Sequence, residues 1–284
     1  MNIKKFFLLL PFAILPIFII SYITVSYMLT GTVTGMYKHT EKVDKTMKQV
    51  SGVKQGKEAQ PKDSASTIDE KQASEVYIIC IDPGHQAKHN NDKEPVAPNS
   101  KEFKAKVSPG SKGIVTKTPE YQLNLEVSLL LKKELEKRGY AVVMTRETNK
   151  VNISNIERAE LANSSNADVF LRIHADGDKL SETSGISVLC PAEDSSYTRE
   201  IYKKSELLAS CILDELILAT EGSSRGVDYR SDLTGFNWSK VPVALIEMGF
   251  LTNPEEDRKL NTEEYRLKIV HGIAEGLERY FDKI

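Results

Sequence analysis

Three ionisable side chains stand where apolar segments of the sequence end. His85 follows VYIICIDPG, His174 ends DVFLRIH, and Glu247 ends VPVALIE. Short apolar segments of this kind are typical of buried strands, and in open α/β sheets ligands bind in the crevice beyond the carboxyl ends of strands. A fourth residue, Glu120, lies in the first turn of a predicted helix. If the three strands run parallel, the four side chains converge on one crevice.

The chemistry of these four residues suits a hydrolytic zinc centre. Zinc in hydrolases is commonly bound by two histidines and one glutamate, with water at the fourth position. His85, Glu120 and His174 could supply that set. A further carboxylate that does not bind the metal is needed as general base and then general acid, and Glu247 could fill this role.

Each of these residues also has an ordinary interpretation. A single histidine after a strand is usually a hydrogen-bonded loop residue, which applies to His85 and His174. Glu120 suits the start of a helix, where the helix dipole favours a carboxylate. Glu247 is the most suggestive, because a carboxylate in VALIEMGF is costly to bury unless it is paired or functional. The spacing alone does not establish a metal site, since no compact H-E-x-x-H motif is present.

The elements that must position these residues alternate between strand and helix from Val76 onward. Several predicted strands are almost entirely apolar, which is typical of strands covered on both faces. The pattern therefore predicts an α/β fold with a mixed, mostly parallel sheet flanked by helices on both faces. The predicted strands lie at 76–81, 140–145, 167–173, 185–190 and 241–248, and the predicted helices at 119–138, 154–162, 198–219 and 263–281.

Helix boundaries are indicated by their capping residues. Thr118 is predicted as an N-cap, with Pro119 at the first helical position. Ser154 and Glu157 form the pattern of a capping box. Residues 86–117 are polar and rich in Pro, Gly and Lys, so they are predicted to form a long surface loop. One hypothesis is that this loop covers the site and inhibits it.

The N-terminal segment predicts a membrane anchor. Residues 6–29 contain no charge and follow Lys4 and Lys5, and they are long enough to cross a hydrocarbon core of about 30 Å. The length and the lack of a small-residue cleavage site favour an uncleaved anchor over a cleaved signal peptide. The two lysines would stay inside, so the rest of the chain is predicted to lie outside a bacterial cell membrane.

The chain is thus expected to have three parts. Residues 1–31 form the anchor, residues 32–75 a flexible polar linker, and residues 76–284 the catalytic domain. The net charge of −2 gives no reason to expect nucleic acid as a partner. The three cysteines form no C-x-x-C pair and are interpreted as buried small apolar residues rather than metal ligands. They are Cys80, Cys190 and Cys211.

Several motifs resemble one family of enzymes. They are IDPGHQ at 81–86, PEYQLNL at 119–125, the segment at 145–177 that ends in RIHADG, and the segment at 225–253 that contains VALIEMGF. Together they are similar to the zinc-dependent N-acetylmuramoyl-L-alanine amidases of the amidase 3 type, over about residues 76–284. The family fold is a mixed sheet flanked by helices.

The resemblance implies a specific reaction. The enzyme would use a zinc-activated water to hydrolyse the amide between the lactoyl group of N-acetylmuramic acid and the L-alanine of the stem peptide in peptidoglycan. His85, Glu120 and His174 match the zinc ligands, and Glu247 matches the catalytic glutamate. The lone anchor and the absence of wall-binding repeats are similar to amidases that act on spore cortex, which implies a role in sporulation.

Departures from the family pattern concern the substrate side of the site. The segment between His85 and Glu120 is long and rich in Lys and Pro, where many members have a shorter Gly-rich loop. Arg172 stands where a small residue is common. The other departures are Tyr121, where Lys is commoner, and Asp176, where Asn often stands.

Candidates for substrate binding come from the C-terminal motif. Asn237 and Trp238 could line a glycan or peptide groove, although a packed tryptophan is the ordinary alternative. Arg225 falls in the same motif. For Arg158, Asn163 and Arg225, surface or helix-capping roles are at least as well supported.

Two other functions stay open at the level of sequence. The same metal set could serve a zinc peptidase or deacetylase that acts on another bond of the wall. The chain could instead be a non-catalytic, membrane-tethered module that binds or regulates the cell wall. An activator protein is a further partner that the sequence leaves unidentified.

Overall fold

The computed structural model describes residues 76–284, which fall within the second of the chain's two units, residues 72–284. The described helices and strands all belong to the second unit. The anchor predicted at residues 6–29 and the linker predicted at 32–75 lie outside the described residues. Within residues 76–284, no helix combines the length and the apolar composition needed to cross a membrane.

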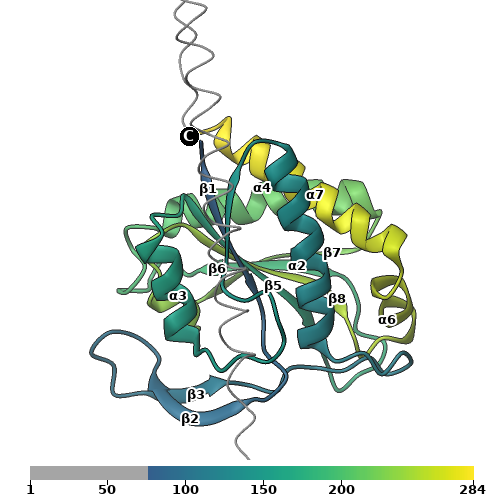
Figure 1. Cartoon of the computed structure of the whole chain (residues 1–284), viewed down its shortest axis with the longest axis horizontal. Coiled ribbons are helices and arrows are strands. Elements are labelled where there is room, and N and C mark those ends of the chain that lie inside the picture. The colour runs from purple at the N-terminus through teal and green to yellow at the C-terminus, as the bar shows by residue number, and fades with distance from the viewer. Residues whose placement is uncertain (1–75) are drawn as a thin grey trace, which may run out of the picture. The chain divides into compact units, whose positions relative to one another are not determined.

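A six-stranded sheet forms the centre of this unit (Figure 1). Its strand order is β4-β1-β5-β8-β6-β7. The first four strands of that order run parallel, whereas β6 is antiparallel to β8 and parallel to β7. The predicted mixed, mostly parallel sheet is therefore confirmed. The strands are β1 (Ile78–Pro83), β4 (Ala141–Met144), β5 (Val169–Asp176), β6 (Ile186–Pro191), β7 (Ser224–Arg230) and β8 (Val243–Phe250).

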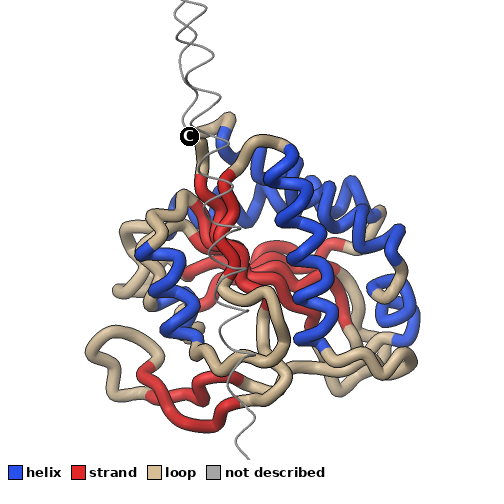
Figure 2. The backbone as a smooth tube through the Cα atoms, in the orientation of Figure 1, coloured by secondary structure: helices blue, strands red, loops and turns tan. Residues whose placement is uncertain are grey.

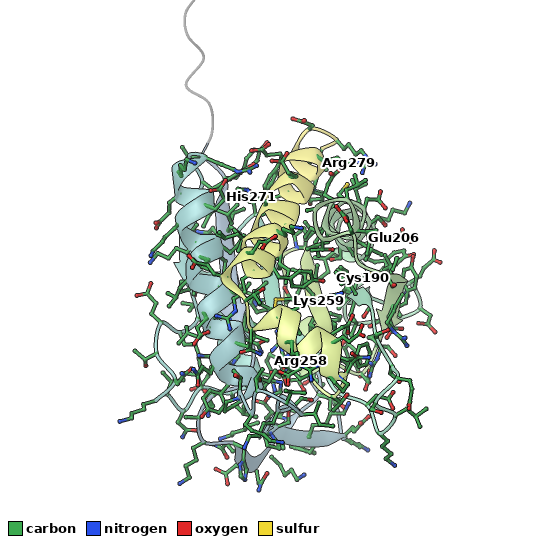
Figure 3. The ribbon with its side chains drawn as sticks, turned by 90° about the vertical axis from the view of Figure 1, so that its right-hand side faces the viewer. Cys190, Glu206, Arg258, Lys259, His271 and Arg279 are labelled. Carbon is green, nitrogen blue, oxygen red and sulfur yellow. The ribbon has the colours of Figure 1, made fainter. Side chains whose placement is uncertain are left out.

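Helices cover both faces of the sheet (Figure 2). One face is covered by α2 (Glu120–Lys137), α4 (Tyr202–Thr220) and α7 (Glu263–Phe281), which pack on one another. The other face is covered by α3 (Asn155–Ser164) and the short α5 (Thr234–Asn237). Helix α6 (Pro254–Leu260) packs against β8 and α7. His271 lies on the outer side of α7 and is half-exposed (Figure 3).

The two faces have separate apolar cores because successive side chains of a strand point to opposite sides. In β5, Leu171 and Ile173 pack in the core beneath α2, α4 and α7, whereas Phe170 packs in the second core with Ala159 of α3. The central strands are apolar on both sides for this reason. The three cysteines are free and buried, as the sequence predicts.

The helix boundaries agree with the capping patterns in one case and differ in another. The capping box of Ser154 and Glu157 is present at the start of α3. At the start of α2, however, the N-cap is Pro119 rather than Thr118. The Thr118 hydroxyl donates instead to Asn261 Oδ1 at 2.8 Å. The backbone N–H of Glu120 is satisfied by the Ser111 carbonyl at 3.0 Å, so a side-chain cap is not required there.

The prediction of a continuous surface loop at residues 86–117 is wrong in part. This segment contains an antiparallel hairpin, formed by β2 (Asn90–Pro95) and β3 (Phe103–Val107), in a two-stranded sheet of its own. The β2 sequence NNDKEP has low strand propensity and no alternation of apolar residues. Contacts with the rest of the fold, rather than local preference, hold these residues extended.

Candidate active site

His85 follows β1 on a loop with an unusual backbone. Its φ angle is +59°, a left-handed conformation that costs a non-glycine residue free energy. Its Nδ1 lies 2.9 Å from the carbonyl oxygen of Ser108, which accepts a hydrogen bond from the protonated nitrogen. The other ring nitrogen, Nε2, lies 3.0 Å from Oε1 of Glu120. Burial alone would lower the pKa of His85, but the carboxylate of Glu120 outweighs it and raises the pKa. The loop therefore presents Nε2 toward the first residue of α2, where a metal ion could take the place of a proton.

Glu120 connects the two histidines. Its Oε1 lies 3.0 Å from His85 Nε2 and 3.1 Å from His174 Nδ1. Its Oε2 accepts a hydrogen bond from the backbone N–H of Ser111 at 2.7 Å, and Asn124 donates to Oε1 at 3.1 Å. Burial alone would raise the pKa of Glu120, but the two histidines outweigh it and hold the pKa well below its usual range. The carboxylate is thus fixed in position and charged.

His174 lies at the carboxyl end of β5 and packs directly on Gly84. A Cβ atom at Gly84 would lie 2.2 to 2.6 Å from three atoms of the His174 ring, so only glycine leaves room for it. Burial lowers the pKa of His174 to about 4, which keeps the imidazole neutral at pH 7. Its Nε2 is buried and has no hydrogen-bond partner among residues 76–284. A neutral imidazole with an unpartnered nitrogen is suited to bind a cation.

The three side chains together fit a metal ion. Their ligand atoms all lie within 4.8 Å of one another. Two imidazoles and one carboxylate match the ligand set of catalytic zinc sites, which leave one position open. The sequence predicted these three residues for this purpose, and the fold brings them together because β1 and β5 are adjacent and parallel.

Glu247 lies beside this group on the neighbouring strand. In the register of β5 and β8 it pairs with His174, and its Oε2 is buried without a hydrogen-bond partner. Burial, followed by the negative charges of Glu120 and Asp176, raises the pKa of Glu247 well above its usual range. A carboxyl group with a raised pKa holds a proton more readily than an ordinary glutamate, which suits a group that must accept a proton and return it.

A second charged cluster lies behind the site and was not predicted from the sequence. Asp82 is fully buried, and its carboxylate accepts hydrogen bonds from Arg158 at 2.5 Å, Thr145 at 2.6 Å and Arg172 at 2.9 Å. Arg158, for which a surface or capping role was the alternative, is only 1% exposed and also donates to the carbonyl of His85. The available signal for such a network was an aspartate and an arginine within apolar strands, Asp82 of β1 and Arg172 of β5.

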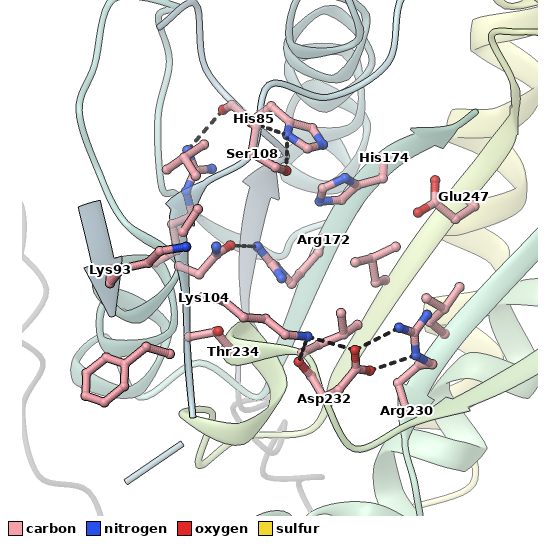
Figure 4. A pocket seen from close by; sticks show the side chains of 18 residues that line it. His85, Lys93, Lys104, Ser108, Arg172, His174, Arg230, Asp232, Thr234 and Glu247 are labelled. Carbon is pink, nitrogen blue, oxygen red and sulfur yellow. Dashed lines mark hydrogen bonds and ion pairs between the residues drawn. The ribbon is translucent and has the colours of Figure 1, made fainter. Parts of the chain in front are cut away.

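A cavity of about 560 Å³ opens in front of the metal group (Figure 4). His85, His174 and Glu247 line one side of it, and the β2–β3 hairpin forms another wall. Further polar lining residues were not singled out from the sequence. They lie on or just after the unpredicted hairpin, at the start of α3, or between the end of β7 and the start of α5: Lys93, Lys104, Ser108, Asn155, Arg230, Asp232 and Thr234.

The three residues predicted to bind substrate are not among those that line this cavity. Asn237 donates to the carbonyl of Val96 at 3.1 Å, and Trp238 Nε1 donates to the carbonyl of Pro95 at 3.1 Å. Both residues therefore hold the hairpin. Arg225 lies over the ring of Phe250, 5.1 Å from its centroid, and donates to a backbone carbonyl. A direct role of these residues in substrate binding stays a prediction.

Comparisons with known proteins agree with this arrangement. Residues 79–279 match the Amidase_3 family, which is described as N-acetylmuramoyl-L-alanine amidase. Among curated relatives, the germination-specific N-acetylmuramoyl-L-alanine amidase of Bacillus subtilis is 27% identical over 217 residues, which cover 72% of this chain and 79% of that protein.

Solved structures give the same result. The amidase Ami1 of Mycobacterium abscessus has a TM-score of 0.65 and 26% identity, over 72% of this chain and 98% of that one. The CwlD amidase of Clostridioides difficile, solved in complex with the GerS lipoprotein, has a TM-score of 0.60 and 26% identity, over 73% of this chain and 100% of that one. The chain therefore belongs to the N-acetylmuramoyl-L-alanine amidase family, whose members hydrolyse peptidoglycan.

Proposed function

We propose that this amidase is zinc-dependent and cleaves the amide between the lactoyl group of N-acetylmuramic acid and the L-alanine of the stem peptide. His85, Glu120 and His174 would hold the zinc, and Glu247 would move the proton. One observation supports this most directly. Two imidazoles, one fixed carboxylate and one unpartnered buried carboxyl group meet at the carboxyl ends of three adjacent parallel strands.

Hydrogen bonds within the protein orient two of the proposed zinc ligands. The hydrogen bond from His85 Nδ1 to the Ser108 carbonyl fixes the tautomer that leaves Nε2 free, and Asn124 and Ser111 fix the carboxylate of Glu120. When bound, zinc supplies a Lewis acid that acidifies water and stabilises negative charge on the carbonyl oxygen. Borderline-soft nitrogen ligands with a single carboxylate favour zinc over magnesium or calcium, which prefer oxygen ligands.

Glu247 performs the proton transfers. Its carboxylate accepts a proton from the attacking water and returns it to the amine of L-alanine as the amide bond breaks. Its raised pKa helps the second step, because the proton taken from water is then held on Glu247 until it can be given to the leaving group. The neighbouring Arg172 and Arg230 oppose this rise only in part.

The test is the digestion of purified peptidoglycan by the zinc-loaded full-length chain, with mass spectrometry of the products. We expect free stem peptides with L-alanine at the amino terminus, together with peptide-free glycan. Glu247→Gln should bind zinc in wild-type amounts but lose turnover by about 10²- to 10⁴-fold. Glu160→Gln, an exposed carboxylate on α3, is the matched control and should retain activity.

Two outcomes would contradict the proposal. Full turnover by Glu247→Gln would remove its role as the general base. Cleavage at a different bond, seen as products that still contain the L-alanine linkage, would favour a peptidase or deacetylase. Loss of bound zinc in His85→Ala, measured by elemental analysis, checks the ligand set independently of activity.

The location of the enzyme is a separate part of the proposal and is supported by the sequence alone. Residues 6–29 would anchor the chain in the cell membrane, with the catalytic residues 76–284 on the outer side. Protease added to intact protoplasts should then remove the catalytic part while leaving the anchor in the membrane. Protection of the whole chain would contradict this orientation.

The stage of the bacterial life cycle at which the enzyme acts, and its protein partner, are also proposals. The germination-specific relative and the complex of CwlD with the GerS lipoprotein support a role on spore peptidoglycan with an activating lipoprotein. Spores of a strain that lacks the gene should germinate poorly while vegetative growth is normal. A defect confined to vegetative cells would count against the spore role.

A further inference from the structure

The β2–β3 hairpin forms one wall of the active-site cavity with a specific set of side chains. Lys93 and Ala105 are paired across the two strands, and both line the cavity together with Phe103 and Val107. Alternation along β3 places Phe103, Ala105 and Val107 on one face of the hairpin, while Lys104 also reaches the cavity from the position between them. Lys93 points from the hairpin toward the interior of the pocket (Figure 4).

The hairpin is fixed in place by buried contacts rather than lying loosely over the site. Glu94 is only 2% exposed and accepts hydrogen bonds from the backbone N–H groups of Asn155 and Ile156, at the start of α3. Trp238 and Asn237 hold its other end through two backbone carbonyls. Lys93 is therefore presented at a set position in the wall.

The cavity has an excess of positive charge although the chain as a whole has a net charge of −2. Lys104 and Arg230 both pair with Asp232, at 2.8 and 2.9 Å, and Arg230 also lies 3.7 Å from the carboxylate of Asp228 outside the cavity lining. Asp82 pairs with both Arg158 and Arg172, so its single negative charge offsets one of their two positive charges. The cationic lining residues are Lys93, Lys104, Arg158, Arg172 and Arg230, and the acidic ones are Asp232 and Glu247.

Lys93 differs from the other cationic lining residues. In the described part of the chain its side chain makes no hydrogen bond and no ion pair, whereas the side chain of each of the others has a carboxylate partner. It shares a cavity with the residues that would cleave the amide. The stem peptide is the part of peptidoglycan that offers carboxylates near that bond, and an ammonium group binds a carboxylate better than a neutral amide.

We propose that Lys93 is a specificity-determining residue that binds a carboxylate of the stem peptide beyond L-alanine. Lys104 and Arg230 reinforce the positive field around it, and amidation of that carboxylate weakens binding. This inference rests on the proposed function, because it assigns the peptide to the cavity in front of Glu247. It makes the hairpin a sensor of stem-peptide amidation.

The experiment compares soluble muramyl tripeptides that differ only in whether one carboxylate is free or amidated. One pair of substrates changes the second residue of the stem and another pair changes the third, so the result identifies the carboxylate that is bound. For the zinc-loaded full-length chain we expect a preference of about 3- to 10-fold for the free acid, mainly in KM.

Variants of the hairpin test the assignment. Lys93→Gln should reduce the preference to about 1, and Lys93→Glu should reverse it. Lys101→Gln makes the same charge change in the turn of the same hairpin, outside the cavity lining, and should keep the wild-type preference. An equal preference in wild type and Lys93→Gln, or no preference in the wild type, would overturn the proposal.

The proposed function can fail separately. If the wild type cleaves none of the four substrates, the amidase assignment is the part in question, and calorimetric titration with the free tripeptides decides about Lys93. Tighter binding of the acidic peptides that is lost in Lys93→Gln supports the subsite. Equal binding of acidic and amidated peptides excludes it.

Discussion

Two groups of buried charge lie side by side at the same edge of the sheet, and they differ in how their polar atoms are satisfied. In the Asp82 cluster, both carboxylate oxygens have partners in Arg158, Arg172 and Thr145. In the group formed by the three candidate metal ligands and Glu247, His174 Nε2 and Glu247 Oε2 are buried and have no hydrogen-bond partner within the described residues. Unpaired buried polar groups are costly, so their presence marks a place kept open for a ligand.

The two groups also shift the pKa of a carboxyl group in opposite directions. Burial alone would raise the pKa of Asp82, but Arg158 and Arg172 outweigh it and hold the pKa well below its usual range. For Glu247, burial raises the pKa and the neighbouring carboxylates of Glu120 and Asp176 raise it further. We infer that the first group supports the fold and that the second is poised for chemistry. The expected effects of substitution separate these two roles.

The largest effect on stability should come from Asp82→Asn. Removing one partner of a buried charge network leaves arginines unpaired, and we expect a loss of about 3–5 kcal/mol in the free energy of unfolding. Urea denaturation measures it. Asp214→Asn, which breaks an exposed ion pair with Arg279, is the matched control and should shift the midpoint very little.

The same carboxylate gives an expected pH dependence. Because the folded protein lowers the pKa of Asp82, its contribution to stability is complete above the unfolded value of about 3.9 and is lost as the pH falls below that value. The fall in stability between about pH 4 and pH 2 should therefore be shallower in Asp82→Asn than in the wild type. Parallel profiles would show that Asp82 is not the group that titrates.

Glu247→Gln should have the opposite effect on stability. Replacing an unpartnered buried carboxyl group by a neutral side chain of the same shape should raise the free energy of unfolding by about 1–3 kcal/mol at pH 7, in the metal-free protein. Thermal unfolding after chelation measures the change. A loss of stability instead would place Glu247 with Asp82 among the structural charges.

Gly84→Ala tests the close packing of the loop after β1 against the ring of His174. The added Cβ would collide with the His174 ring, and overpacking of this kind costs roughly 1–3 kcal/mol. We expect zinc affinity to fall by roughly 5- to 150-fold, measured by competition with a chelator of known affinity. Gly222→Ala, whose Cβ would meet Ile186 and Thr220 away from the site, should keep wild-type affinity.

The smallest effect is expected for Trp238→Phe, which removes the hydrogen bond to Pro95 and keeps an aromatic ring. A typical hydrogen bond contributes about 0.5–1.5 kcal/mol, so KM should rise by about 2- to 12-fold while kcat changes little. A change in kcat alone would mean that Trp238 acts on the metal group rather than on the hairpin wall.

The catalytic side of the site could be predicted from the sequence, and the substrate side could not. His85, His174 and Glu247 were recognisable because each ends an apolar strand, and the parallel order of β1, β5 and β8 then brings them together. The partners of Asp82 lie far apart in sequence, and only the folded sheet joins them.

The β2–β3 hairpin could not be predicted from the sequence, for a physical reason. Its residues have polar side chains and little intrinsic preference for strands, and its position depends on Glu94 reaching the start of α3. Asn237 and Trp238 were identified by type as substrate residues, and the structure uses their polar groups to hold this hairpin.

The attachment of the hairpin has an evolutionary consequence. Asn237, Trp238 and Asn155 bind it through the backbone carbonyls of Pro95, Val96 and Lys106, which every amino acid possesses. Mutations at the side chains that face the cavity can therefore accumulate without loosening the wall. Enzymes of this type could acquire new preferences for cell walls of different composition by changing a few exposed residues, while the hydrolytic centre and its support remain untouched.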